Sequence, residues 1–189
     1  MGAFLGEEEA ELNHQAHDEA VRGSRTHSSR SRLSGSEQVV EFVIGDELFA
    51  VDLFDTREVI NTPEVTPIPN APDYVTGMID LRGVITMIID LRVMMHITRE
   101  STGKKRSRVI VLDKTVSEKM IGILVDDVYS VTTYSREDID QKAHSSSEGH
   151  RDILGVIRKH RKDSGGKNKS TLVIWLDIKK MIGRVEKDL

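Results

Sequence analysis

The chain of 189 residues contains no cysteine. It therefore has no disulfide bond, no thiolate nucleophile and no cysteine ligand for zinc or an iron–sulfur cluster, which excludes many classes of enzyme. Only histidine and carboxylate side chains remain as metal ligands. The sequence also has no apolar run long enough to cross a bilayer. Aromatic residues make up only 4%, but 38% of the residues are apolar, which is enough to fill a hydrophobic core.

The first six residues, MGAFLG, do not resemble a targeting segment. They lack the basic start and apolar stretch of a signal peptide, and they lack the serine or threonine that a myristoylation motif has at its sixth position. With a net charge of −4, the sequence predicts a soluble cytoplasmic protein. Such a protein reaches a membrane only indirectly, through a partner.

Residues 1–36 differ in composition from the rest of the chain. Acidic residues come first and are followed by arginines among serines, with few apolar residues to offset the entropy of ordering. We expect a disordered N-terminal tail, although a short helix formed with a partner remains open. The globular part is predicted to cover 37–189.

Two segments of the chain occur twice in similar form. Residues 77–92, GMIDLRGVITMIIDLR, return near the end as TLVIWLDIKKMI, so that Asp90 corresponds to Asp177. Upstream, FAVDLFDTREV at 49–59 parallels IGILVDDVYSV at 121–131, with Ala50 and Gly122 in register. Self-similarity of this kind indicates a duplicated fold of two similar units.

Apolar, β-prone segments separated by turn residues predict short strands throughout the globular part. In the first unit, hairpins are expected at 39–44 with 48–53 and at 78–81 with 84–89, followed by a short helix at 90–95 and a linker at 99–108. Residues 55–60 fit either a helical turn or a strand. All four prolines lie between 63 and 72, which predicts a stiff, irregular connection.

The second unit is expected to contain five strands and a closing helix. The strands are predicted at 109–112, 120–125, 128–132, 153–157 and 172–176, at the spacing of a small barrel. An amphipathic helix at 177–185 follows. Its apolar positions recur at the spacing that packs one helix face onto a core, and they are Ile178, Met181, Ile182 and Val185.

Few residues are arranged as a catalytic or metal site would require. His14 and His17 stand at helical spacing, but they lie in the predicted tail, and we expect no metal there. Asp126 and Asp127 are adjacent, so in a strand they point to opposite faces, and a solvated turn accounts for them better than an acid–base pair. Asp90 and Asp177 precede predicted helices, where aspartate serves as an N-cap.

A basic segment at 158–169 is the main alternative site. Its lysines and arginines could bind phosphate groups, but no stacking aromatic residues interleave with them, which favours a solvated hairpin loop. Its GGKNKS stretch lacks the residues of a phosphate-binding loop. A nucleic-acid-binding double barrel therefore remains as the alternative function. An enzyme would have to gather histidines or carboxylates from distant parts of the sequence.

Residues 58–92, EVINTPEVTPIPNAPDYVTGMIDLRGVITMIIDLR, closely resemble the signature segment of the CheW family of chemotaxis coupling proteins. That family has a segment of type NLRGxxxPxxDLR after a proline-containing loop, and a VGIxVDxVxxV segment that corresponds here to 121–131. The resemblance covers about 37–182. This chain departs from the pattern at Asp80, Met87 and Asp127.

The resemblance implies an all-β fold of two tandem SH3-like five-stranded barrels packed together, with short helices at the unit ends, including one at the C-terminus. The two barrels would cover roughly 37–98 and 109–189, with exchange of strands between them possible. It also implies a noncatalytic adaptor without a cofactor or metal, which couples methyl-accepting chemoreceptors to the regulatory domain of the histidine kinase CheA. Nucleic acid is not expected as a partner, and recruitment to membrane receptor arrays would occur through the receptors.

The same resemblance implies two sets of contact residues. Receptor binding is expected at Thr56, Glu58, Gly77 and Arg82. Kinase binding is expected at Val65, Thr66 and Ile68. An alternative for Arg82 and Glu58 is that they only pair with each other at the surface, which would contribute at most about 1 kcal/mol.

Overall fold

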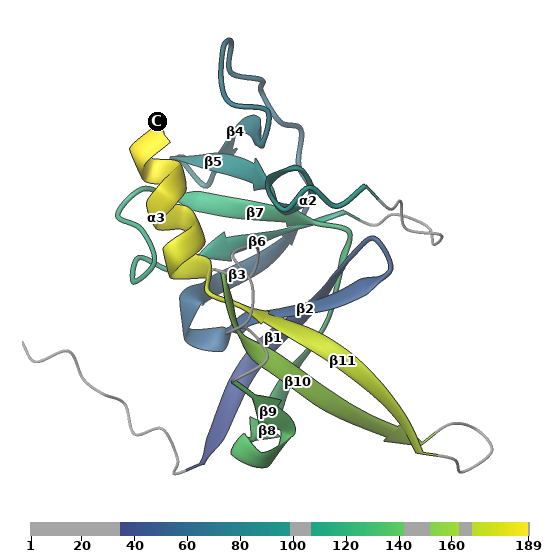
Figure 1. Ribbon diagram of the computed structural model, residues 1–189. Coiled ribbons are helices and arrows are strands. Elements are labelled where there is room, and N and C mark those ends of the chain that lie inside the picture. Colours follow the sequence, from purple (N-terminus) through teal and green to yellow (C-terminus); the bar gives the residue numbers. More distant parts are fainter. Residues whose placement is uncertain (1–34, 99–106, 142–151, 163–167, 189) are drawn as a thin grey trace, which may run out of the picture. The chain divides into compact units, whose positions relative to one another are not determined.

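The computed structural model describes residues 35–98, 107–141, 152–162 and 168–188 (Figure 1). The predicted tail lies outside these residues except for its last two positions, and so do residues 99–106 of the predicted linker. No helix of the described part is both long and apolar enough to cross a membrane.

The described residues form eleven strands in two sheets, two α-helices and two short 3-10 helices. The first sheet has the order β8-β1-β2-β11-β10-β9 and the second the order β3-β6-β7-β5-β4. The elements in chain order are β1 (Ser36–Ile44), β2 (Glu47–Asp52), η1 (Leu53–Asp55), β3 (Thr56–Asn61), β4 (Val75–Leu81), β5 (Val84–Asp90), α2 (Leu91–Met94), β6 (Arg108–Leu112), β7 (Ile121–Val125), β8 (Asp127–Ser135), η2 (Arg136–Asp138), β9 (Ile139–Asp140), β10 (Ile153–Lys162), β11 (Asn168–Leu176) and α3 (Ile178–Asp188).

The predicted all-β fold class is confirmed, and the sequence patterns located most of the strands. Both predicted hairpins form, and Asp90 and Asp177 cap the two α-helices by accepting hydrogen bonds from backbone amides. The ambiguous segment 55–60 ends η1 and continues as β3. The two-residue strand β9, which no pattern indicated, extends the first sheet to six strands.

Each sheet takes strands from both repeated units. The first sheet joins β1 and β2 to β8, β9, β10 and β11, whereas the second contains β3 to β7, which are consecutive in the chain. Each sheet therefore contains strands from both 37–98 and 109–189.

The two sequence repeats meet as parallel strand pairs, one in each sheet. In the first sheet Ala50 of β2 lies opposite Trp175 of β11, and in the second Gly122 of β7 lies opposite Ile88 of β5. The small residue of one repeat thus faces the bulky residue of the other. This complementarity explains why Ala50 and Gly122 stand in register.

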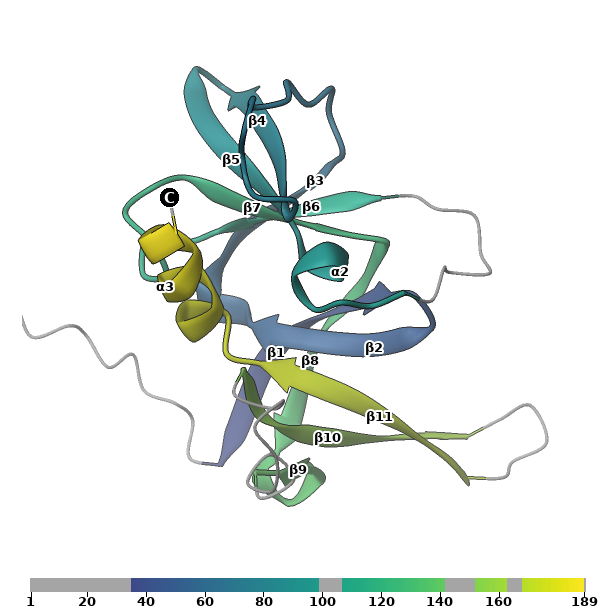
Figure 2. The same ribbon diagram turned by 45° about the horizontal axis from the view of Figure 1, so that its top comes forward.

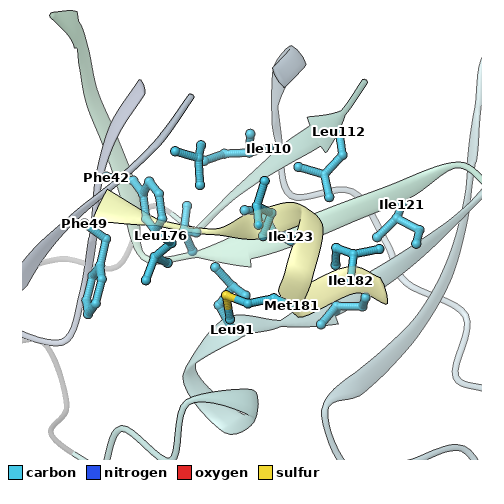
Figure 3. Packing of buried hydrophobic residues seen from close by; sticks show 14 of the residues in the cluster. Phe42, Phe49, Leu91, Ile110, Leu112, Ile121, Ile123, Leu176, Met181 and Ile182 are labelled. Atoms are coloured by element: carbon cyan, nitrogen blue, oxygen red, sulfur yellow. The ribbon is translucent and has the colours of Figure 1, made fainter. Parts of the chain in front are cut away.

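The largest apolar core lies between the two sheets and is closed by α3 (Figure 3). Side chains of both sheets point toward the helix, whose predicted apolar stripe is buried as expected. The labelled members are Phe42, Phe49, Leu91, Ile110, Leu112, Ile121, Ile123, Leu176, Met181 and Ile182. Two smaller clusters are confined to single sheets, one around Trp175 in the first and one around Ile88 in the second.

Strands β10 and β11 continue as a two-stranded ribbon past the rest of the first sheet (Figure 2). β11 pairs with β2 only at residues 173–175, and β10 pairs with β9 only at 156 and 157. Beyond these positions the two strands pair only with each other. Residues 158–162 and 168–169 of the basic segment, which was predicted as a hairpin loop, are strand residues of this ribbon.

Candidate partner-binding site

The β4–β5 hairpin ends in a two-residue turn that contains Arg82. Leu81 pairs with Val84, so Arg82 and Gly83 alone form the loop, with φ angles of 55° and 82°. Positive φ at both positions is what a type I′ turn requires, and glycine or asparagine adopts it more easily than arginine. The backbone amide of Gly83 donates a 2.6 Å hydrogen bond to the Asp80 carboxylate, which fixes the turn. An arginine in a strained position suggests a function for its side chain.

Arg82 forms an ion pair with Glu58 of β3. The distance from Nη2 to Oε2 is 3.0 Å, and 77% of the Arg82 side chain is exposed against 22% of that of Glu58. A pair this exposed contributes between 0 and about 1 kcal/mol to stability. The ion pair orients the guanidinium while its other donors remain accessible to a binding partner.

Apolar side chains lie beside this arginine in the sequence of the hairpin. Val84 and Ile85 follow the turn directly and are 47% and 63% exposed. Arginine is enriched among the residues that dominate protein–protein binding, and the exposed apolar groups beside it add to a surface that a partner can cover.

The other two residues predicted to bind receptors are less accessible. Thr56 is half-buried, and its hydroxyl donates a 3.4 Å hydrogen bond to the carbonyl of Asp52. Gly77 is buried in β4 against the backbone of Thr66. The structure therefore brings Glu58 and Arg82 together, and it places Gly77 beside the residues predicted to bind the kinase.

The predicted kinase-binding residues lie in the proline-containing connection between β3 and β4. Thr66 is exposed and bridges to β4, because its amide donates to the Met78 carbonyl and its carbonyl accepts from the Met78 amide, both at 2.8 Å. Val65 packs against the apolar cluster of the second sheet, and Ile68 is half-buried. This bridge was not predicted from the sequence, since an isolated pair of hydrogen bonds has no periodic pattern.

A second carboxylate–cation pair lies inside the first sheet. Glu41 of β1 is fully buried and accepts hydrogen bonds from Tyr134 of β8 and from Lys159 of β10. Burial alone would raise the pKa of Glu41, but the hydrogen bonds from Lys159 and Tyr134 outweigh it and hold the pKa below its ordinary value. Burial and the neighbouring Glu41 raise the pKa of the Tyr134 phenol.

Lys159 therefore corrects one interpretation of the sequence. It was grouped with a solvated basic loop, but its ammonium group reaches the buried Glu41, and only 30% of its side chain is exposed. Alternation along β10 explains the difference, because Arg158 and His160 on either side are exposed. The side chains of the remaining basic residues of the loop lie outside the described part.

Asp126 corrects another interpretation. Instead of lying in a solvated turn it is buried, accepts a 2.7 Å hydrogen bond from the Gly45 amide, and forms an ion pair with Arg92 of α2. It therefore joins the β1–β2 turn to α2. Asp127, its neighbour, lies near Arg108 at 3.7 Å, so the two carboxylates do not act as a pair.

Within the described ranges, no three histidine or acidic side chains are grouped as a metal site would require. The candidate ligands His14 and His17 lie outside those ranges.

Comparison with known proteins gives the same family in three ways. A family model described as the CheW-like domain matches residues 38–186. The chemotaxis protein CheW of Treponema pallidum is 31% identical over 153 residues, covering 79% of this chain and 84% of that protein. CheW of Rhizobium meliloti is 29% identical over 133 residues, covering 70% and 84%. The crystal structure of the scaffolding protein TtCheW from Thermoanaerobacter tengcongensis superimposes with a TM-score of 0.61 at 25% identity, covering 74% of this chain and 83% of that one.

The fold, which is shared with a scaffolding protein, defines a class of noncatalytic β-sheet scaffold proteins. The chain belongs to the CheW family, and it is an adaptor of chemotaxis signalling. These comparisons favour the adaptor over the nucleic-acid-binding alternative.

Proposed function

We propose that this adaptor couples the cytoplasmic tips of methyl-accepting chemoreceptors to the regulatory domain of the histidine kinase CheA. Its receptor contacts are Arg82 and Glu58 with Thr56 beside them, and its kinase contacts lie at 65–68. Binding both partners on one scaffold raises their effective concentration and makes kinase output depend on the state of the receptor. The adaptor is then recruited to receptor arrays at the membrane through the receptors.

The observation that carries this proposal is the position of Arg82. The turn holds the arginine in a backbone conformation that a smaller residue would adopt more easily, and the ion pair with Glu58 adds little stability. Its side chain is therefore better explained by a contact with another molecule. A guanidinium that meets a polar group in a desolvated rim contributes strongly to binding.

Isothermal titration of a receptor-tip fragment against the full chain tests the proposal. Replacing Arg82 by alanine should weaken receptor binding by about 2 kcal/mol or more, which is roughly 30-fold, while the melting temperature stays nearly unchanged. Arg57→Ala is the matched control, because Arg57 is an exposed arginine of the same sheet whose guanidinium donates a hydrogen bond to the sulfur of Met120. Equal affinities of both variants and the wild type would refute the assignment of Arg82.

The kinase contact is tested separately with a fragment of the kinase regulatory domain. Ile68→Asp places a charge on the half-buried edge of the proline-containing connection. We expect it to weaken kinase binding at least tenfold and to leave receptor binding unchanged. A loss of both affinities in parallel with the melting temperature would show that Ile68 serves the fold only.

A further inference from the structure

Gly77 lies where β4 comes unusually close to the connection before it. Its φ is +149°, a conformation that is essentially limited to glycine, and Thr76 forms a bulge between the pairs Val75–Ile89 and Gly77–Ile88. A Cβ atom at this position would lie 2.3 Å from the Thr66 carbonyl oxygen and 2.8 Å from Cγ1 of Val65. Because a backbone carbonyl cannot rotate away as a side chain does, only glycine permits this approach.

The close approach allows the two hydrogen bonds between Thr66 and Met78 to form. The connection at 62–74 is also held at its end, where the Pro72 carbonyl accepts a hydrogen bond from the Val75 amide and the Tyr74 carbonyl accepts one from the Asp90 amide. Between Thr66 and Tyr74 lie Pro67, Pro69 and Pro72, which fix φ and leave little internal freedom. A displacement of Thr66 therefore moves residues 65–68 together.

The same strand leads from this bridge to the exposed arginine. Met78 and Arg82 are four residues apart on β4 and its turn, or about 13 Å in an extended strand. β4 is paired with β5 from Gly77 to Leu81, so the bridge at Met78 and the turn at Arg82 belong to one hydrogen-bonded hairpin. Receptor contact at one end of β4 can thus reach the connection at the other.

We propose that Gly77 is a positioning residue that couples receptor engagement at Arg82 to the kinase-contacting residues 65–68, and that it is not itself a receptor contact. This inference rests on the proposed function. It accounts for the burial of Gly77 on a surface where a receptor contact was expected. In energetic terms, Gly77 makes the affinity for one partner depend on the presence of the other.

The experiment compares Gly77→Ala with Gly122→Ala in the full chain. A Cβ at Gly122 would be too close to two side-chain atoms, Cγ1 of Val109 at 2.6 Å and Cδ1 of Ile88 at 3.0 Å, whereas the Ile110 carbonyl oxygen is at an ordinary 3.9 Å. The variant therefore strains the same sheet without touching the connection. Kinase-fragment affinity is measured with and without saturating receptor-tip fragment. In the wild type we expect the receptor to change kinase affinity by roughly 5-fold or more.

For Gly77→Ala we expect this ratio to fall to about 1, with receptor affinity kept within roughly threefold. Backbone amide exchange distinguishes a local loss of the bridge from a general destabilisation of the sheet. The Thr66 and Met78 amides should exchange faster in Gly77→Ala relative to the other amides of the sheet, and they should remain protected in Gly122→Ala.

A second pair of variants keeps the test decisive if Gly77→Ala does not fold. Thr66→Pro removes the amide donor of the bridge from an exposed residue in a connection that already tolerates prolines, while Thr66→Ala keeps the amide and removes the side chain. The proline variant alone should abolish the coupling.

Two results would overturn the inference. One is a loss of receptor affinity in Gly77→Ala at least as large as its loss of kinase affinity. The other is an equal effect of the receptor fragment on kinase affinity in the two variants of a pair, either Gly77→Ala and Gly122→Ala or the two Thr66 variants. Failure of the wild-type chain to bind either fragment would instead refute the proposed function, and the inference with it, before any variant is compared.

Discussion

In the first sheet a carboxylate–cation pair is buried inside the sheet, whereas in the second sheet the comparable pair lies at its surface. Glu41 is fully buried and bound by Lys159 and Tyr134, while Arg82 beside Glu58 is 77% exposed. Both pairs join a glutamate on an early strand of the sheet to a cation from a later hairpin. A buried pair is costly to break, but an exposed pair contributes little and can exchange partners. We infer that the first sheet supports the fold and the second presents the contacts.

The largest expected effect is the loss of the buried carboxylate. Glu41→Gln should lower the free energy of unfolding by about 3 kcal/mol or more, because Lys159, whose side chain is only 30% exposed, then loses its charged partner. Urea denaturation measures this change. Glu58→Gln is the matched control in the second sheet, and we expect less than about 1 kcal/mol. Equal losses would remove the distinction between the two pairs.

The next largest effect concerns the small residues that correspond in the two sheets. Gly122→Ala should cost about 1–3 kcal/mol, because the added methyl meets Val109 and Ile88 in a packed interior. Ala50 already carries this methyl opposite Trp175, where the first sheet accommodates it. Gly183→Ala in α3, where a Cβ meets nothing within 4 Å, should stabilise the chain slightly and controls for glycine replacement itself. If Gly122→Ala is as stable as the wild type, the side chains around Gly122 can move to accommodate the methyl group despite their close packing.

A smaller effect is expected in acid. The pKa of Glu41 is lower in the folded chain than its ordinary value of 4.5, so its contribution to stability is fully present above that value and is lost as the pH falls through the folded pKa. The free energy of unfolding of the wild type should therefore decrease below about pH 4.5 more steeply than that of Glu41→Gln. Parallel curves would mean that the buried carboxylate does not titrate differently on folding.

The smallest effect on stability is expected at the turn that carries Arg82. Arg82→Asn relieves the positive φ of the turn and loses the ion pair with Glu58, two changes of opposite sign that should leave the unfolding free energy within about 0.5 kcal/mol. Receptor binding should nevertheless fall as for Arg82→Ala. A clear stabilisation with intact receptor binding would show that Arg82 is dispensable. A large destabilisation would show that the Arg82–Glu58 pair supports the fold as the Lys159–Glu41 pair does.

Most strands could be predicted because alternation and turn residues act locally. The two repeats indicated a duplicated fold, and the register of Ala50 with Gly122 marked the positions where bulky residues of the other repeat pack. Which strands pair could not be read from periodicity, because pairing depends on contacts between residues far apart in the chain.

The structure corrects the sequence-based interpretation of two charged residues, and both errors have a physical cause. Arg82 and Glu58 were identified through the family resemblance, and the turn geometry supports an outward role for Arg82. The roles of Lys159 and Asp126 were misjudged because charged residues are assumed to be solvated unless a partner is known. Glu41 carried a signal in the sequence, since it is a charged residue between Val39 and Val43 on a strand face where both valines are buried.

The position of the second sheet in the chain has a consequence for biosynthesis. Strands β3 to β7 follow one another without interruption, so this sheet can close as soon as Val125 has left the ribosome. The β1–β2 hairpin is synthesised earlier, but its partner strand β11 begins only at residue 168. Phe42 and Phe49 therefore lack their core neighbours from β11 and α3 while more than half of the chain is synthesised. The hairpin made first is thus completed last, and this interval is when the nascent chain is most exposed to misassociation and to capture by chaperones.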